Sequence, residues 1–100
     1  MNPRKRDEVI NALLRKGFVR SDDKDHIKFF YTNQAGEKTR VWTKISRGKK
    51  HSEIGRPNLG HMAKQCKLSN ENFGRLLDCP LSREDYEDML IEAGQISKAT

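Results

Sequence analysis

Histidine is the residue type best suited to move protons near neutral pH, because an imidazole side chain titrates there. The sequence holds three, His26, His51 and His61. They are not spaced four residues apart, and no carboxylates accompany them in the patterns typical of metal ligands. We therefore predict no metal site. We also predict no cofactor, since Gly55 and Gly60 do not form a glycine-rich phosphate loop.

His26 differs from the other two histidines in its neighbours. It lies between Asp25 and Lys28 at the start of a predicted strand. The same face of the sheet is expected to display Arg40 and Lys44 from the following strand. An imidazole placed there can accept a proton while the cations hold a phosphate group. A lone histidine at a strand start is more often an ordinary surface residue, so the residues alone leave both interpretations open.

The face that carries His26 is predicted to be basic and to include one large aromatic ring. Trp42 can stack a nucleic-acid base there, or it can be an ordinary half-buried sheet residue. The loop at 46–52 is cationic and contains Gly48, which lets it turn. The residues predicted to contact nucleic acid are Lys28, Arg40, Trp42, Lys44, Arg47, Lys49, Lys50 and His51.

The distribution of charge supports a polyanionic partner. The net charge is +6 and the isoelectric point is about 9.6. Residues 1–67 hold 17 of the 20 Lys and Arg but only 7 of the 14 Asp and Glu, a net charge of +10, whereas residues 68–100 carry −4. Lys and Arg neutralise phosphates and release counterions, which favours a nucleic acid as the partner. The alternative is a charged surface that only keeps the protein soluble.

Length and composition limit the class of protein. One hundred residues, 34% of them hydrophobic and 34% charged, make one domain with a modest core. No apolar run approaches the ~18 residues that a membrane span needs, and no hydrophobic stretch follows the basic N-terminus. Cys66 and Cys79 are too few and too far apart for a disulfide scaffold or a zinc ribbon. A cytoplasmic protein without membrane association is the expected class.

The periodicity of apolar residues predicts the elements that position these side chains. A first helix is expected between an N-cap at Asn2 and a terminating Gly17. Strands follow at 18–21, 26–32 and 38–45, where apolar and polar residues alternate. This pattern indicates an antiparallel meander with one basic, solvent-facing surface.

The second half of the sequence predicts three helices. Pro57 begins the first, and Ser69 and Ser82 are the expected N-caps of the next two. The core of helices and sheet is expected to be complete by Leu77. His61 lies on the first of these helices and is predicted to be a surface residue without a function.

The order of several short motifs resembles that of HicA-type toxins over about residues 8–78. The strand start Asp25-His26, leading into Lys28-Phe29-Phe30, is similar to the segment that carries the family's Gly-Ser-His motif, although Lys24-Asp25 replaces Gly-Ser here. The remaining matches are the turn at Gly36, the strand Thr39-Arg40-Val41-Trp42, the loop histidine His51 followed by Glu53-Ile54, and the helix Leu59 to Cys66 running into Lys67-Leu68-Ser69. In place of the family's usual Val-Pro, this sequence has Thr43-Lys44.

The resemblance implies a small mRNA interferase with a double-stranded-RNA-binding-like α-β-β-β-α fold, paired with a HicB antitoxin. It implies that His26 is the catalytic histidine and that His51 lies in a loop facing the substrate. We accordingly expect an α+β protein with a three-stranded antiparallel sheet, formed by a HicA-like domain at 1–78. A C-terminal helical extension at 79–100 is expected to pack on the same domain.

The predicted function is RNA binding with metal-independent endoribonuclease activity. His26 would deprotonate a ribose 2′-OH, while Lys28, Arg40 and Lys44 would stabilise the charge on the phosphoryl oxygens. His51 is the one candidate for a general acid. Two alternatives stay open: a non-catalytic RNA-binding module of the same fold, and a basic interaction protein for an acidic partner.

Overall fold

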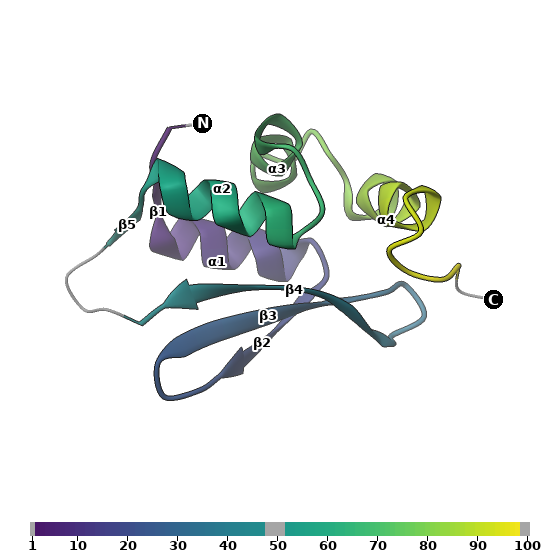
Figure 1. The fold of residues 1–100 in the computed structure, drawn as a ribbon, viewed down its shortest axis with the longest axis horizontal. Helices are drawn as coiled ribbons and strands as arrows, with labels where there is room; N and C mark the ends of the chain where they lie inside the picture. The colour runs from purple at the N-terminus through teal and green to yellow at the C-terminus, as the bar shows by residue number, and fades with distance from the viewer. Residues whose placement is uncertain (1, 48–51, 99–100) are drawn as a thin grey trace.

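A three-stranded antiparallel sheet forms one layer of the computed structural model, which describes residues 2–47 and 52–98 (Figure 1). Its strands are β2 (Phe18–Asp22), β3 (His26–Thr32) and β4 (Lys38–Ser46), in the order β2-β3-β4. The predicted α+β class and the three-stranded antiparallel sheet are confirmed. The alternation that predicted the strands also sets their faces, because Ile27 and Phe29 are buried and the residues between them are not.

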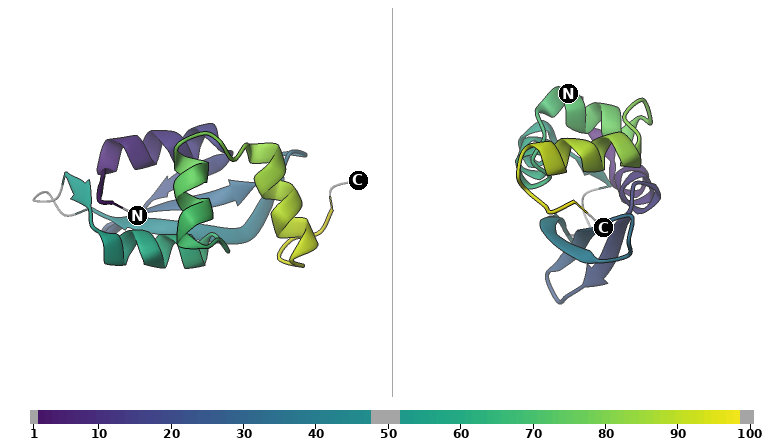
Figure 2. Two further views of the ribbon diagram at one scale, coloured as in Figure 1. Left: turned by 90° about the horizontal axis from the view of Figure 1, so that it is seen from above. Right: turned by 90° about the vertical axis from the view of Figure 1, so that its right-hand side faces the viewer.

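Helices cover one face of this sheet and leave the other face open (Figure 2). Within the described residues they are α1 (Arg6–Arg15), α2 (Arg56–Gln65), α3 (Asn70–Leu77) and α4 (Arg83–Glu92). As a result, every apolar side chain on the inner face of the sheet packs into one core shared with the helices.

The two serine caps predicted from the sequence are present. The Ser69 hydroxyl accepts a hydrogen bond from the Asn72 backbone N–H at 3.1 Å and begins α3. The Ser82 hydroxyl accepts one from the Asp85 backbone N–H at 3.1 Å and begins α4. Each bond satisfies a backbone donor that the first helical turn leaves without a partner, which explains where these helices start.

The N-terminal helix begins later than predicted. Arg4–Lys5 forms a short strand, β1, paired antiparallel with β5 (Glu53–Ile54). The Arg4 guanidinium also forms an ion pair with Asp78, with an Nη2–Oδ2 distance of 2.8 Å. These partners from distant parts of the chain hold Arg4 in an extended conformation, so α1 begins at Arg6 and not after Asn2.

The expectation that the core is complete by Leu77 is wrong, because α4 contributes to the same hydrophobic cluster. Tyr86 is fully buried and stacks on Phe18 with ring centroids 6.0 Å apart. It also meets Tyr31 edge-on at 5.2 Å, and its hydroxyl donates to the Cys66 carbonyl at 2.8 Å. The last helix therefore covers one end of the sheet and is part of the core.

A buried carboxylate fastens α4 to the hairpin between β3 and β4. Glu87 is only 3% exposed, and its Oε1 accepts from the Tyr31 hydroxyl at 2.6 Å and from the Gln34 backbone N–H at 2.9 Å. Burial, followed by the hydrogen bond to Glu87, raises the pKa of the Tyr31 hydroxyl, which keeps it protonated as a donor. Arg83 adds hydrogen bonds to two carbonyls of the same hairpin. One acidic residue of the C-terminal segment therefore serves the fold.

Candidate functional site

The open face of the sheet carries a row of apolar side chains across all three strands. We call the sheet surface facing away from the helices the outer face. There Phe30 lies opposite Val19 on one side and Trp42 on the other. Val19 is 54% exposed and Trp42 is 36% exposed. The Phe30 and Trp42 rings stack with their centroids 5.8 Å apart and their planes 25° apart. A ring pair in this position can take a flat base on its solvent side.

Lysines surround the stacked rings. The Lys38 Nζ lies 3.9 Å from the centroid of the Phe30 ring, and the Lys28 Nζ lies 5.7 Å from that of Trp42. Cations near aromatic faces are held by the ring quadrupole while they keep contact with solvent. The outer face therefore combines aromatic rings with positive charge, which single-stranded nucleic acids require of a binding surface.

Two like charges stand directly opposite each other in the next row of the outer face. Lys28 pairs in register with Lys44 across β3 and β4. Such a pair destabilises a sheet, and Asp23 offsets part of the repulsion through an ion pair to Lys28 at 3.2 Å. An anion bound between the two lysines would remove the rest. This row lies about 7 Å along the strand from the aromatic row, the spacing of side chains on one face.

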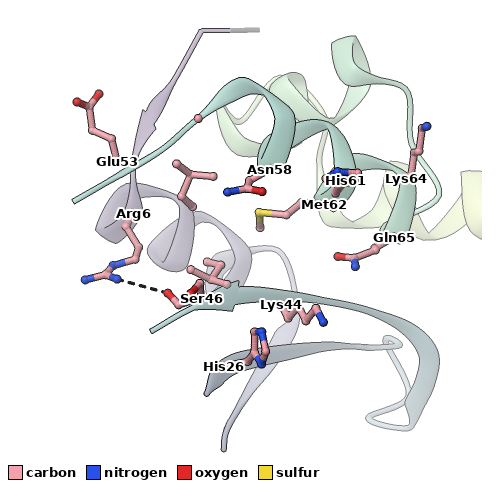
Figure 3. Close-up of a pocket in the computed structure, with 13 residues that line it drawn as sticks. Arg6, His26, Lys44, Ser46, Glu53, Asn58, His61, Met62, Lys64 and Gln65 are labelled. Carbon is pink, nitrogen blue, oxygen red and sulfur yellow. Dashed lines mark hydrogen bonds between the residues drawn. The ribbon is translucent and has the colours of Figure 1, made fainter. Parts of the chain in front are cut away.

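His26 begins β3, one row beyond the Lys28–Lys44 row along the strand, and its side chain lines a pocket (Figure 3). The pocket has a volume of about 510 Å³ and lies between the sheet and α2. Figure 3 shows His26 and Lys44 below it and Asn58, His61 and Gln65 above it. The volume falls in the range of ~300–1,000 Å³ typical of small-molecule sites, so a nucleotide-sized group can enter.

The charged residues that line the pocket are mainly cationic. Arg6, Lys44 and Lys64 line it together with one carboxylate, Glu53. The Arg6 guanidinium donates a hydrogen bond to the Ser46 carbonyl at 3.4 Å, across the pocket's rim. The balance of charge favours an anion such as a phosphate over a cation.

The backbone of His26 is held by Asp23 and not by its neighbour Asp25. The Asp23 Oδ1 accepts from the backbone N–H of His26 at 2.7 Å and from that of Asp25 at 2.9 Å. These hydrogen bonds, led by that from His26, and the ion pair with Lys28 lower the pKa of the Asp23 carboxyl below its usual value. Asp23 therefore stays ionised and fixes the turn from which the histidine projects.

A buried hydroxyl orients one polar side chain at the pocket. Thr43 is fully buried, and its hydroxyl donates to the Gln65 Oε1 at 2.7 Å. The amide of Gln65 also carries two N–H donors. Gln65 can then donate hydrogen bonds to an oxygen atom bound in the pocket.

The remaining predicted contacts differ in their placement. Arg40 is exposed on the outer face and available to a ligand. Arg47, in contrast, reaches back to Asp22 at 3.3 Å and to the Asp23 carbonyl at 3.0 Å, so its guanidinium closes the β2–β3 turn. The predicted contacts Lys49, Lys50 and His51 lie outside the described residues.

Three further observations concern metal binding, cysteine reactivity and membrane spans. In the described part of the chain, no three His, Cys, Asp or Glu side chains are grouped so that they could hold a metal ion. Burial raises the pKa of the Cys66 thiol to about 12, which makes it a packing residue and not a nucleophile. Among the helices described, none combines the length and apolar character of a membrane-spanning segment.

Comparison with protein-family models, with curated proteins and with solved structures finds no significant match to this chain. The resemblance to HicA-type toxins therefore stays a prediction from the sequence.

Sequence reasoning missed the α2 side of the pocket. Asn58, His61, Met62 and Gln65 follow one another at helical spacing and all line the cavity. The prediction that His61 is a surface residue is confirmed, since its side chain is exposed, but the sequence alone did not place it in a pocket. The stripe of polar residues around Met62 was the available signal. Phe30 was also missed as a stacking partner, although strand alternation places it beside Trp42.

Proposed function

We propose that this protein binds RNA on its outer face and cleaves it in the His26 pocket without a metal ion. The observation that carries the proposal is that His26 lines a cavity of about 510 Å³ together with Lys44 and Arg6. A proton acceptor beside cations is the arrangement that phosphodiester transfer to a neighbouring hydroxyl needs. The order α1-β2-β3-β4-α2 supports the double-stranded-RNA-binding-like fold, which is part of the proposal together with a cytoplasmic location.

The rows of the outer face suggest how an RNA strand would lie. A base would stack on the Phe30–Trp42 pair, and the next phosphate would sit between Lys28 and Lys44. The following ribose would then reach His26, about 13 Å along β3 from Phe30 at the usual strand rise. Binding on the outer face and chemistry in the pocket would therefore share the side chains of His26 and Lys44.

The proposed reaction is an internal transesterification. The His26 imidazole takes the proton from a ribose 2′-OH, and the 2′ oxygen forms a bond to the adjacent phosphorus atom. The bond between phosphorus and the 5′ oxygen breaks, giving a 2′,3′-cyclic phosphate and a 5′-OH. Lys44 and Arg6 stabilise the negative charge on the phosphoryl oxygens as it develops. The 2′-OH is the nucleophile, so DNA would bind without being cut.

The test is cleavage of an end-labelled RNA by the full chain, in EDTA. We expect the wild type to cut and the His26→Gln variant to lose activity by about 10²- to 10⁴-fold, the usual contribution of acid–base catalysis. A deoxyribose at the mapped cleavage position should block the reaction and leave binding intact. Arg75→Gln is a suitable control, since Arg75 is exposed on α3 and does not line the pocket. An unchanged rate for His26→Gln would refute the assignment.

One observation favours a second function, a non-catalytic RNA-binding module. The Phe30–Trp42 stack lies outside the pocket and needs no chemistry to hold a base. RNA binding by the wild type without any cleavage would establish this alternative. If the basic outer face bound an acidic protein such as a HicB-like antitoxin and not RNA, the interaction-protein alternative would replace both.

A further inference from the structure

A second histidine lines the pocket of the proposed reaction centre, on its α2 side. His61 extends from α2, while His26 extends from the start of β3 (Figure 3). The two residues are 35 positions apart in the sequence, and the packing of α2 beside β4 brings them to one cavity. His61 belongs to the α2 stripe that includes Asn58, Met62 and Gln65, and its side chain is exposed to solvent at the pocket.

The proposed reaction needs a proton donor as well as a proton acceptor. The oxygen that leaves phosphorus is an alkoxide, which departs slowly unless it receives a proton as the bond breaks. Of the side-chain types that line the pocket, imidazole is the one that proteins most often use to give and take protons. Glu53 is the one carboxylate lining the pocket, and Figure 3 shows it directed away from His26.

We propose that His61 is the general acid of this pocket, an inference that rests on the proposed function. His26 removes the proton from the 2′-OH, the 2′ oxygen bonds to phosphorus, and His61 gives its proton to the departing 5′ oxygen. His26 ends protonated and His61 neutral, and exchange of protons with water restores both. The two histidines thus act from opposite sides of the phosphate, and Gln65, held by Thr43, donates to a phosphoryl oxygen between them.

The decisive experiment varies the leaving group at one phosphate. The cleavage site is first mapped with the wild type, and the same RNA is then made with sulfur in place of the 5′ bridging oxygen there. A thiolate leaves without being protonated, so this substrate needs the base but not the acid. The variants are His61→Gln, His26→Gln and Arg56→Gln. Arg56 is the matched control because it lies on the same helix and is exposed but does not line the pocket.

The proposal makes a separate prediction for each substrate. His61→Gln should slow cleavage of the oxygen-bridged RNA by about 10²- to 10⁴-fold and leave the sulfur-bridged RNA cleaved at the wild-type rate. His26→Gln should slow both, and Arg56→Gln should slow neither. Equal losses on both substrates with His61→Gln, or no loss on either, would overturn the role of His61 while leaving the proposed function in place. A wild type that cuts neither substrate would overturn the proposed function itself.

Discussion

Replacing Trp42 with alanine tests whether the outer face holds a base by stacking. Trp42 packs on Phe30 with ring centroids 5.8 Å apart and remains 36% exposed, so part of its ring surface is open to a ligand. Stacking of a base on an aromatic side chain contributes ~1–3 kcal/mol. Since each ~1.4 kcal/mol changes a dissociation constant tenfold, Trp42→Ala should weaken binding of single-stranded RNA by about 5- to 140-fold.

The variant should remain folded. An aromatic pair contributes ~0.5–1.5 kcal/mol beyond the area that it buries, whereas a domain is stable by ~5–15 kcal/mol. Trp42→Phe keeps an aromatic ring and should retain most of the affinity. Leu14→Ala is the matched apolar control, because Leu14 is 44% exposed but lies on α1, away from the outer face.

The assay is the anisotropy of a labelled single-stranded RNA at one fixed salt concentration, since affinity for phosphate depends strongly on salt. Trp42 is the only tryptophan in the sequence, so its own fluorescence reports directly on a base placed against it. We expect quenching that saturates with the anisotropy change. If Trp42→Ala binds as tightly as the wild type, or if RNA binding leaves the fluorescence unchanged, the stacking surface is wrong.

Two further predictions concern the core. Tyr86→Phe removes the hydroxyl that donates to the buried Cys66 carbonyl and should lower the free energy of unfolding by about 1–3 kcal/mol. Tyr86→Ala should lower it by about 3–5 kcal/mol, as measured by urea unfolding followed by circular dichroism. An unchanged unfolding midpoint for the alanine variant would show that α4 does not belong to the core. At pH 8 a thiol reagent should label one cysteine per chain in the native state, the exposed Cys79, and both cysteines in denaturant. The reason is that burial shields the Cys66 thiol and raises its pKa to about 12, which keeps it protonated. Rapid labelling of both cysteines in the native state would contradict the burial of Cys66.

The features predictable from the sequence are those with local causes. The faces of β3 follow from alternation, and the starts of α3 and α4 follow from hydroxyl caps at Ser69 and Ser82. In each case the residues that determine the structure are within a few positions of one another. His26, Lys28 and Lys44 were placed on one face for the same reason.

The features that could not be predicted depend on contacts between distant segments. The pairing of Arg4 with Ile54 joins residues about 50 positions apart and outweighs the local signal for a helix at Pro3. The short apolar stripe of α4 did not reveal that Tyr86 would reach Phe18 and Tyr31. The pocket also depends on distant segments, since its lining comes from α1, β3, β4, β5 and α2. No periodicity within one element indicates that His61 would line the same pocket as His26.

Identification of the ends produced by RNA cleavage tests the central claim most directly. Purified protein is incubated with a defined RNA in EDTA, and the products are analysed by mass spectrometry for the wild type and for His26→Gln. A histidine that activates the 2′-OH must leave a 2′,3′-cyclic phosphate on one fragment and a 5′-OH on the other. We predict these ends for the wild type and their loss in the variant. Fragments with a 5′-phosphate and a 3′-OH, or an RNA that stays whole while bound, would contradict the account.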